Sequence, residues 1–326
     1  MMPRLSVVIR CLNEEAHIGR LLVGIEQQRG VETDVVVVDS GSTDSTLAIA
    51  RRFPVRIVHI EPSRFSFGRS LNLGFENAEA DIVVAASAHV YPQRDDWLAH
   101  LARPFSDDSV ALSYGRQVGA ASSAFSEQMI FERWYPATSE PVQRHPFCNN
   151  ANAAVRRSVW EGIRYDEELT GLEDLDWAKR AMASGHRVSY VAEAAVVHVH
   201  EQSPAQVVDR YRREAIAHRR IYDNQRMTSV EAGALGIVNI FGDLLAARRQ
   251  RSALRDAKAI VSFRTAQFLG TYRGFAQEGT VPEELKKRFY YPPSLRGGPA
   301  PSVPPSGEPI LYEAVTMSGT NGSVAE

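Results

Sequence analysis

The first third of the chain alternates short apolar runs with stretches whose apolar residues recur at helical spacing. The apolar runs have the length of strands buried on both faces and lie at residues 5–12, 34–39, 55–60 and 82–87. The residues at helical spacing after the first run are Ile18, Leu21, Leu22 and Ile25. Further helices are expected up to Arg52, over 69–79 and over 95–102. Strands and helices that alternate at this pace predict right-handed crossovers and a mainly parallel sheet.

After residue 102 the alternation becomes less regular. Strands are predicted at 110–118, 153–157, 188–191 and 195–200, and a helix at 173–184. Residues 122–150 are rich in aromatics and proline, and we expect them to be irregular. A helical and basic pattern follows, and Pro, Gly and Ser are frequent near the end. We therefore expect an α/β domain over residues 1–202, a helical basic segment over 203–290 and a disordered tail over 291–326.

The charge of the chain is unevenly distributed. The formal net charge is only −2, which gives no bulk attraction to nucleic acid and argues against it as a partner. Residues 1–202 hold 20 Lys and Arg against 27 Asp and Glu, whereas residues 203–291 hold 16 against 9. A basic segment on an acidic body suggests contact with an anionic surface, and a membrane fits better than DNA.

The cysteines and the apolar stretches indicate the compartment. Cys11 and Cys148 are the only cysteines, too few for a disulfide framework, and they fit a reducing cytosol. The longest apolar stretch, residues 232–247, is interrupted by Asn239 and Asp243 and is shorter than the roughly 20 apolar residues of a spanning helix. We expect a cytoplasmic protein, with peripheral contact at the inner face of the membrane as a further expectation.

Polar clusters stand at the ends of three predicted strands. They are Asn13-Glu14-Glu15, Asp39-Ser40-Gly41-Ser42 and Ser87-Ala88-His89. The carboxyl ends of neighbouring parallel strands meet at one edge of a sheet, so these clusters should line one crevice. Each cluster alone is also compatible with helix capping, which for Asn13 would place Glu14 and Glu15 in the first turn of a helix. The glycine-rich motifs of dinucleotide and P-loop sites are missing, which excludes those two classes.

Histidines mark one of these strand ends and a second place late in the chain. His89 follows the strand at 82–87, and His198 and His200 lie at the end of the strand predicted at 195–200. Together they could hold a metal ion and, through it, a phosphate. A histidine packed beside a turn is the alternative for each residue taken singly.

The order of these motifs resembles the family 2 glycosyltransferases of the GT-A fold. The motifs are SVVIRCLNEE at 6–15, VVDSGSTDST at 37–46, FGRSLNLG at 67–74, the strand ending in Ser87-Ala88-His89, and GLEDLDW at 171–177. The resemblance covers roughly residues 3–200, and it extends less specifically to rhamnosyltransferase-like enzymes of bacterial surface polysaccharides. It implies a nucleotide diphosphate sugar, UDP- or dTDP-linked, as the donor. The donor-binding residues that it implies are Asn13, Glu15, Asp39, Ser42, Arg69, Asn72, Ser87 and Ala88.

The resemblance also implies the roles of the metal site and of an acidic pair. The family's Asp-x-Asp metal motif falls on Ser87-Ala88-His89, where both carboxylates are missing. A divalent ion, Mn²⁺ or Mg²⁺, would then depend on His89 with His198 or His200. The pair Glu173-Asp174 matches the family's catalytic-base motif, with Asp174 as the base of an inverting transfer and Glu173 in a supporting role.

The function implied is transfer of a sugar to a hydroxyl of a glycan or lipid-linked acceptor in surface polysaccharide synthesis. The alternatives are an inactive nucleotide-sugar-binding protein, because of the lost carboxylates, and a nucleotidyltransferase, whose glycine-rich first loop is not found here. In the basic segment, Arg210, Arg213 and Arg220 are expected on one helix face, above anionic headgroups. Packing of this segment on the catalytic domain or on a second subunit, as in a homodimer, is the competing interpretation.

Overall fold

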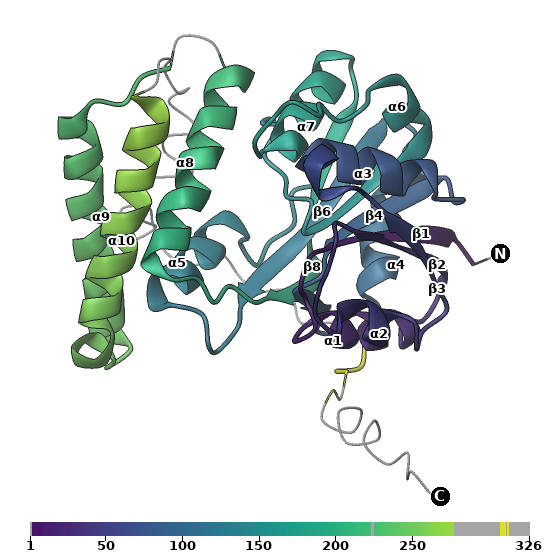
Figure 1. The fold of residues 1–326 in the computed structure, drawn as a ribbon, viewed down its shortest axis with the longest axis horizontal. Coiled ribbons are helices and arrows are strands. Elements are labelled where there is room, and N and C mark those ends of the chain that lie inside the picture. The colour runs from purple at the N-terminus through teal and green to yellow at the C-terminus, as the bar shows by residue number, and fades with distance from the viewer. Residues whose placement is uncertain (1, 223–224, 277–306, 311, 313–326) are drawn as a thin grey trace, which may run out of the picture.

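A computed structural model of the protein describes residues 2–222, 225–276, 307–310 and 312. Its centre is an eight-stranded sheet with the order β3-β2-β1-β4-β7-β6-β8-β5 (Figure 1). The strands are β1 (Arg4–Cys11), β2 (Glu32–Asp39), β3 (Val55–His59), β4 (Ile82–Ser87), β5 (Val90–Pro92), β6 (Val110–Gly119), β7 (Asn152–Arg156) and β8 (Arg187–His198). Strands β5 and β7 run antiparallel to their neighbours, and the others share one direction. The sheet is therefore mainly parallel, as predicted.

Alternate side chains of the central strands enter two separate cores, one on each face of the sheet. Val7 and Val37 belong to one core, and Val8 and Val36 belong to the other. The first core is covered by α1 (Ile18–Glu26), α2 (Thr46–Ala50) and α4 (Trp97–Ala102). The second is covered by α3 (Phe67–Glu76), α6 (Arg157–Gly162) and α7 (Glu173–Ala183), and short 3₁₀ turns lie at Pro62–Arg64 and Arg103–Ser106. Strands buried on both faces explain why the apolar runs are continuous.

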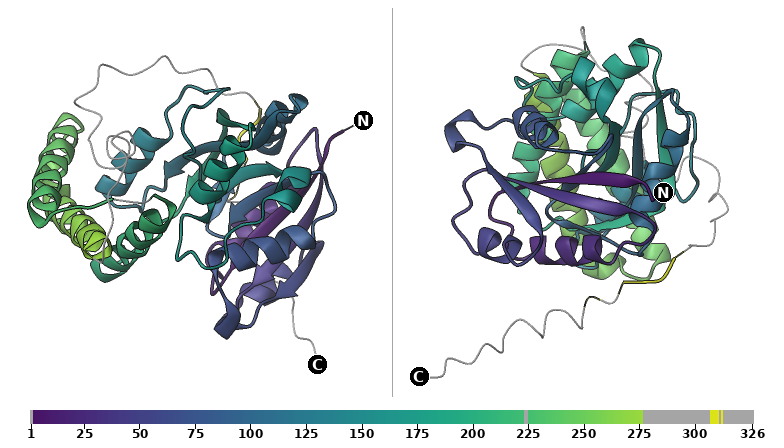
Figure 2. Two further views of the ribbon diagram at one scale, coloured as in Figure 1. Left: turned by 90° about the horizontal axis from the view of Figure 1, so that it is seen from above. Right: turned by 90° about the vertical axis from the view of Figure 1, so that its right-hand side faces the viewer.

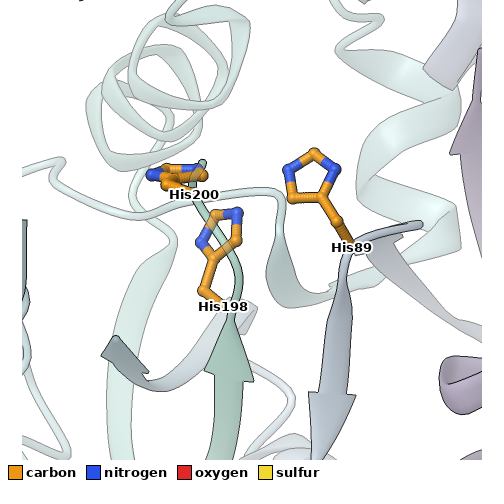
Figure 3. A group of neighbouring side chains, drawn as sticks. All are labelled: His89, His198 and His200. Carbon is orange, nitrogen blue, oxygen red and sulfur yellow. The ribbon is translucent and has the colours of Figure 1, made fainter. Parts of the chain in front are cut away.

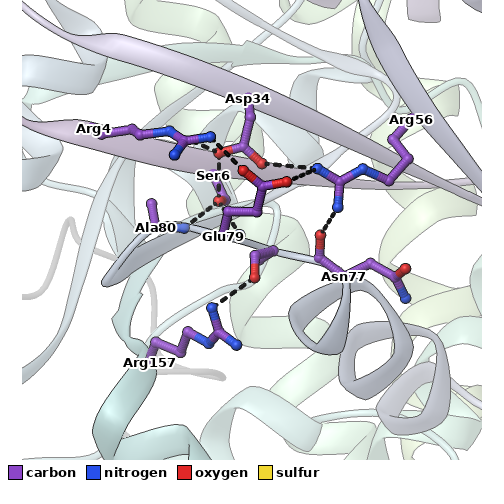
Figure 4. Close-up of polar contacts among 9 residues, drawn as sticks. Arg4, Ser6, Asp34, Arg56, Asn77, Glu79, Ala80 and Arg157 are labelled. Carbon is purple, nitrogen blue, oxygen red and sulfur yellow. Dashed lines mark hydrogen bonds and ion pairs between the residues drawn. The ribbon is translucent and has the colours of Figure 1, made fainter.

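An ion network joins the strands at the edge of the sheet where β1 begins (Figure 4). Glu79 accepts hydrogen bonds from Arg4 at 2.5 Å and from Arg56 at 2.7 Å, and Asp34 accepts one from Ser6 at 2.7 Å. The two arginines and Glu79 are exposed, so solvent screens these ion pairs and each contributes little to stability. The network links β1, β2 and β3 to the turn before β4, and it leaves the carboxyl ends of the strands free for other chemistry.

Three local predictions were wrong. The first helix begins after His17 rather than at Asn13, because Asn13 takes a left-handed conformation with φ 54° and turns the chain. Residues 122–150 contain a helix, α5 (Phe125–Trp134). The two strands expected at 188–191 and 195–200 form one continuous strand, β8, whose pairing with β6 is shifted between Gly115 and Gln117.

Three long helices stand side by side next to the sheet (Figures 1 and 2). They are α8 (Pro204–Ile221), α9 (Ser229–Arg249) and α10 (Ala253–Phe275), as the helical pattern predicts. Helices α8 and α10 approach closely because glycines face the α8 backbone. A Cβ at Gly270 would lie 2.3 Å from the carbonyl oxygen of Val208, and one at Gly274 would lie 2.6 Å from that of Arg212. Both glycines are therefore required by the packing.

Helix α5 connects the helical segment to the rest of the protein. Phe125 and Met129 of α5 pack with Ala247 of α9 and Ile260 of α10 in one buried cluster. Ser126 of α5 donates a hydrogen bond of 2.6 Å to Asp243 of α9. The helical segment thus shares a core with residues from within 1–202, and the domain division at residue 202 stays a prediction.

A short piece of the predicted tail lies against the edge strand β5. The Asp95 carboxylate accepts from the Glu308 backbone at 2.8 Å, and Ile310 donates to the Gln93 carbonyl at 3.2 Å. The Tyr312 hydroxyl donates to the carbonyl of Pro92 at 2.5 Å. Residues of β5 and of the turn after it provide these partners, and the predicted disorder of the tail stays a prediction. The other residues of the expected tail lie outside the described part of the chain.

Candidate active site

A pocket opens where β1, β4 and β8 end and where α7 and α8 begin to cover the sheet. It comprises about 1000 Å³ of space, part of it open to solvent. Its lining includes all of the predicted catalytic and metal-binding residues, namely Glu173, Asp174, His89, His198 and His200, and also Ser87 from the predicted donor-binding residues. Arg10 of β1, Glu127 of α5, and Arg210 and Arg213 of α8 also line it. Residues far apart in sequence therefore meet at the sheet edge where ligands bind in open α/β folds.

A second group of predicted residues surrounds the turn after β2. Asn13 accepts a hydrogen bond from the Thr43 backbone at 2.8 Å, and its own N–H donates to Ser42 Oγ at 3.0 Å. Glu15 accepts from the Ser45 backbone at 2.9 Å. The loop after β1 and the loop after β2 are thus held together. These contacts also explain the polar clusters as mutual capping, and a role for Asn13, Glu15 and Ser42 in donor binding stays a prediction.

Asp39 is the buried acid of this second group. Its carboxylate accepts from the backbone N–H groups of Gly41 and Ser42, each at 3.1 Å. Burial opposes ionisation of Asp39, but the hydrogen bonds from Ser42 and Gly41 hold its pKa below the usual value. His59 lies 3.3 Å away and is more exposed. Asp39 is therefore a buried anion fixed by the turn after β2, and its contact with a nucleoside stays a prediction.

The structure assigns Asn72 a different role from the predicted one. Its amide donates to the Tyr165 carbonyl and to Glu167, and its oxygen accepts from Trp160 Nε1 and the Tyr165 backbone, all at 3.0–3.1 Å. These bonds use the full hydrogen-bonding capacity of the side chain and give it a structural role, while the predicted donor contact of Asn72 stays a prediction. Arg69 pairs with Glu167 at 2.7 Å and is part-exposed, so a donor contact there stays a prediction. The FGRSLNLG motif anchors α3 to the loop before α7.

The three predicted metal-binding histidines lie together (Figure 3). One ring nitrogen of each lies within 4.8 Å of a ring nitrogen of the other two. The ring centroids of His198 and His200 are 4.0 Å apart, and His89 lies 5.1 Å from His198 and 5.8 Å from His200. Ser87 contributes only a hydroxyl, 3.1 Å from His89 Nε2, and Ala88 is buried with no polar side-chain atom.

Each of the histidines has a partner at Nδ1. His89 Nδ1 lies 2.7 Å from Glu14, His198 Nδ1 lies 2.6 Å from Gln117, and His200 Nδ1 lies 2.7 Å from Glu127. For His89 and His198, an oxygen that accepts from Nδ1 leaves Nε2 as a lone-pair donor, which is the usual environment of a metal-ligating histidine. His200 Nδ1 also lies 2.8 Å from a guanidinium nitrogen of Arg210. The Nε2 atom of His198 is buried and has no hydrogen-bond partner among the described residues. The cluster therefore fits a metal ion.

Burial determines the charge of the cluster. Burial, together with the charges of His200 and His89, lowers the pKa of His198 well below its usual value. Burial also lowers the pKa of His200, although the neighbouring Glu127 acts in the opposite direction. Both rings are therefore neutral near pH 7, as a metal ligand must be. Glu127 is buried too, but Arg210 at 3.0 Å and His200 lower its pKa to about 2, so it is an anion.

The acidic pair lies at the start of α7, on the opposite wall of the pocket. Glu173 forms an ion pair of 3.1 Å with Arg10 of β1. Asp174 accepts from the backbone N–H groups of Asn150 at 3.0 Å and Leu175 at 2.8 Å. Burial and then the charge of Glu173 raise the pKa of Asp174 to about 7. Such a carboxylate is poised to take up a proton near neutral pH.

Several residues of the site could not be found from the sequence pattern. Glu127 falls in the stretch that we expected to be irregular, and Gln117 falls in a strand without a motif. Arg10 did leave a signal, because it is a charged residue inside an otherwise apolar strand. Such a residue needs a buried partner, and here the partner is Glu173.

The predicted membrane-facing arginines of α8 instead face the rest of the protein. Arg210 is buried against Glu127, Arg213 lies over the ring of Phe67 at 5.2 Å, and Arg220 donates to the Glu168 carbonyl at 2.7 Å. For Arg210 the predicted headgroup contact is wrong, because its side chain is largely buried against Glu127. Arg213 and Arg220 are exposed, and a headgroup contact for these two stays a prediction. The spacing of the three arginines does align them on one face of α8. Arg210 and Arg213 of that face line the pocket.

Comparisons with known proteins agree with this architecture. Residues 6–162 match the family model described as "Glycosyl transferase family 2". The O-antigen chain rhamnosyltransferase WbaN of Salmonella anatum is 27% identical over 67% of this chain and 73% of its own length. The mannosyltransferase PcManGT of Pyrobaculum calidifontis, solved with GDP-Man and Mn²⁺, superposes with a TM-score of 0.57 at 18% identity, over 85% of this chain and 88% of its own. TarS of Staphylococcus aureus, residues 1–349 with UDP-GlcNAc, gives a TM-score of 0.50 at 17% identity, over 81% and 90% of the two chains.

The chain is an enzyme of the glycosyltransferase class with a GT-A fold, as the resemblance of its motif order implied. It belongs to the family 2 glycosyltransferases, which use a nucleotide sugar as the donor. Solved relatives of this fold include a complex with a divalent ion.

Proposed function

We propose that the protein is an inverting glycosyltransferase that acts in surface polysaccharide synthesis. It moves a sugar from a nucleotide diphosphate, UDP- or dTDP-linked, to a hydroxyl of a glycan or lipid-linked acceptor in the cytoplasm. The observation that carries this proposal is the buried Asp174, whose raised pKa makes it a general base in the same pocket as the histidine cluster. Similarity to an O-antigen chain rhamnosyltransferase supports the class of product.

The donor is expected to span the two groups of residues. Its nucleoside lies near Asp39 and the turn from residue 40 to 44, and its diphosphate lies near Ser87 and His89. The contact between Glu14 and His89, at 2.7 Å, joins the loop after β1 to the pocket and links the two groups. Arg10 and Arg213 give the pocket positive charge beside the expected diphosphate.

His89, His198 and His200 are the residues that would hold a divalent ion in this enzyme. The bound ion would supply positive charge that stabilises the diphosphate leaving group. An imidazole set suits Mn²⁺ and softer ions, whereas Mg²⁺ prefers oxygen ligands, so we place Mn²⁺ before Mg²⁺. The carboxamide of Gln117 and the carboxylates of Glu14 and Glu127 orient the rings from behind.

Asp174 carries out the proton transfer. The acceptor oxygen attacks the anomeric carbon while the bond from that carbon to the diphosphate oxygen breaks, and the hydroxyl proton passes to Asp174. One displacement inverts the anomeric configuration. The backbone N–H groups of Asn150 and Leu175 fix the carboxylate, and the ion pair of Arg10 with Glu173 lies beside it.

The test uses a panel of nucleotide sugars and measures the nucleoside diphosphate released with a glycan acceptor. Asp174→Asn should lose about 10²–10⁴ in turnover, because its amide cannot take up the proton, with little change in donor affinity. Asp176→Asn is the matched control, since Asp176 lies in the same helix but pairs with Arg180, and it should retain turnover. An Asp174→Asn variant with more than about a third of wild-type turnover would exclude Asp174 as the base.

A further inference from the structure

Helix α9 presents its apolar side chains outward. Its exposed side chains include Val230, Ile237, Val238, Phe241 and Leu245, with Phe241 63% and Val230 80% exposed. They recur at spacings of three and four and form one continuous face. The ribbon shows α9 at the far side of the helical segment from the sheet (Figure 1). We name this surface the α9 outer face.

The polar residues in the middle of α9 point inward instead. Asn239 is 1% exposed and bonds the Leu235 carbonyl at 2.8 Å. Asp243 is 2% exposed and forms a bidentate pair with Arg264 of α10, at 2.7 and 3.0 Å. From residue 232 to 247, Asp243 is the only ionisable side chain, so the outer face carries no charge over this length. A surface helix of a water-exposed protein has the opposite arrangement.

The apolar surface continues onto α10. Val261 and Leu269 of α10 are 45% and 39% exposed. A shallow groove runs between the two helices and is lined by Gly233, Ile237, Ile240, Phe268 and Leu269, among others. Exposed apolar side chains that are contiguous over two helices mark an interaction surface, whereas single ones are ordinary.

Cationic side chains stand at one end of this surface, around the turn between α9 and α10. They are Arg248, Arg249, Arg251, Arg255 and Lys258, and all are exposed. The acid among them, Asp256, is already paired with Arg255 at 2.9 Å. In α9 itself the acids are Glu231 and the buried Asp243, so the same face of a second copy would offer little negative charge to the arginines. An anionic lipid surface offers both an apolar layer and negative headgroups.

The geometry points to a membrane-binding surface formed by the α9 outer face and the cationic turn. The partner is an anionic lipid bilayer, with Phe241 and its neighbours in the headgroup boundary and Arg248 and Arg249 over anionic headgroups. Among the described helices, α9 is the one that is long and apolar enough, by length and composition, to cross a membrane. The ion pair that Asp243 and Arg264 form inside the helical segment instead favours a helix lying on the surface. This inference does not depend on the proposed catalytic roles.

Vesicle flotation of the full-length protein tests the inference. The vesicles contain either phosphatidylcholine alone or phosphatidylcholine with a third phosphatidylglycerol. Wild-type protein should float with the anionic vesicles and much less with the neutral ones, and added salt should weaken binding. Arg248→Glu with Arg249→Glu should reduce partition into anionic vesicles by roughly 25-fold, about fivefold per arginine. Phe241→Ser should reduce it by roughly tenfold even at low salt.

Matched variants within residues 1–202, away from the α9 outer face, serve as controls. Arg51→Glu with Arg52→Glu makes the same charge change at an exposed helix end, and Val142→Ser removes an exposed apolar side chain. Neither control should change flotation, and all variants should retain turnover of a soluble acceptor. No flotation at low salt would overturn the inference, whether light scattering then shows a dimer through this face or a monomer. Equal losses in the control variants would overturn it as well, since binding would then follow net charge alone.

Discussion

Replacing Asp174 by asparagine should make the folded protein more stable at neutral pH even though it removes turnover. Burial and the charge of Glu173 raise the pKa of the Asp174 carboxyl from 3.8 to about 7. The unfolded chain ionises this group at its ordinary pKa, so between 3.8 and about 7 the folded state binds a proton that the unfolded state has lost. The Asp174 carboxyl therefore lowers the free energy of unfolding least below pH 3.8. Its destabilising effect grows as the pH rises and levels off above about 7.

The magnitude follows from the size of the pKa shift. At about 1.36 kcal/mol per pKa unit, the upper bound on the free-energy cost of Asp174 is about 2 kcal/mol at pH 5 and about 4 kcal/mol at pH 8. Asparagine removes this cost at every pH. Asparagine has only one side-chain oxygen, so the hydrogen bond from the Asn150 N–H loses its acceptor. This loss lowers the free energy of unfolding by about 1 kcal/mol at any pH. The gain in stability of Asp174→Asn over wild type should therefore grow by roughly 2–3 kcal/mol from pH 5 to pH 8.

Thermal unfolding followed by circular dichroism at pH 5 and pH 8 measures this difference. The melting temperature of Asp174→Asn, relative to wild type, should rise by a few degrees more at pH 8 than at pH 5. Asp108→Asn is the control, because Asp108 is fully exposed and should give the same small difference at both pH values. If the two variants behave alike, the carboxyl titrates normally and the argument for a base poised near pH 7 is wrong.

Two further predictions concern the histidine cluster and the buried ion pair. Co²⁺ added to the protein should give a visible d–d absorption band, and His198→Ala should abolish that band. The control His100→Ala, on α4, should retain it. Identical spectra in the two variants would argue against a metal on the cluster. Arg264→Leu leaves the Asp243 carboxylate buried without its cation, and urea unfolding should show a loss of about 3–5 kcal/mol, most of it recovered by adding Asp243→Asn. A loss below about 1 kcal/mol would mean that water reaches Asp243 and that α9 packs more loosely than described.

The sheet could be predicted because its strands are buried on both faces. β1, β2 and β4 are continuous apolar runs, and their observed bounds differ from the predicted ones by two residues at most. Helix α5 was missed because it buries Ser126 and Glu127 along with apolar residues, which breaks the periodic pattern. The reversed direction of β7 depends on pairing with β4 and β6, strands that are remote in sequence, and no local signal specifies it.

For the site, the sequence indicated the correct edge of the sheet but not the contacts across it. Asp174 and the three histidines were predicted from motifs and do line one pocket. The hydrogen-bond partners of Asn72 lie about 90 residues further on, so its structural role was invisible. The ion pair of Glu127 with Arg210 likewise could not be predicted. Glu127 lies in α5, which was expected to be irregular, and Arg210 lies in α8, which was expected to face a membrane.

The pairing of Arg210 with Glu127 has a consequence for how the enzyme folds during translation. The strands that hold Ser87 and Asp39 can pair as soon as the first half of the chain has left the ribosome, since β1 to β4 contact one another. Asp174, His200 and Arg210 arrive later, and Glu127 is a buried anion without a cation until α8 is made. A nascent chain released before α8 should therefore have the nucleoside side of the site but an unfinished pocket. A premature stop near residue 200 would yield a polypeptide recognised by quality-control proteases, with no partial activity.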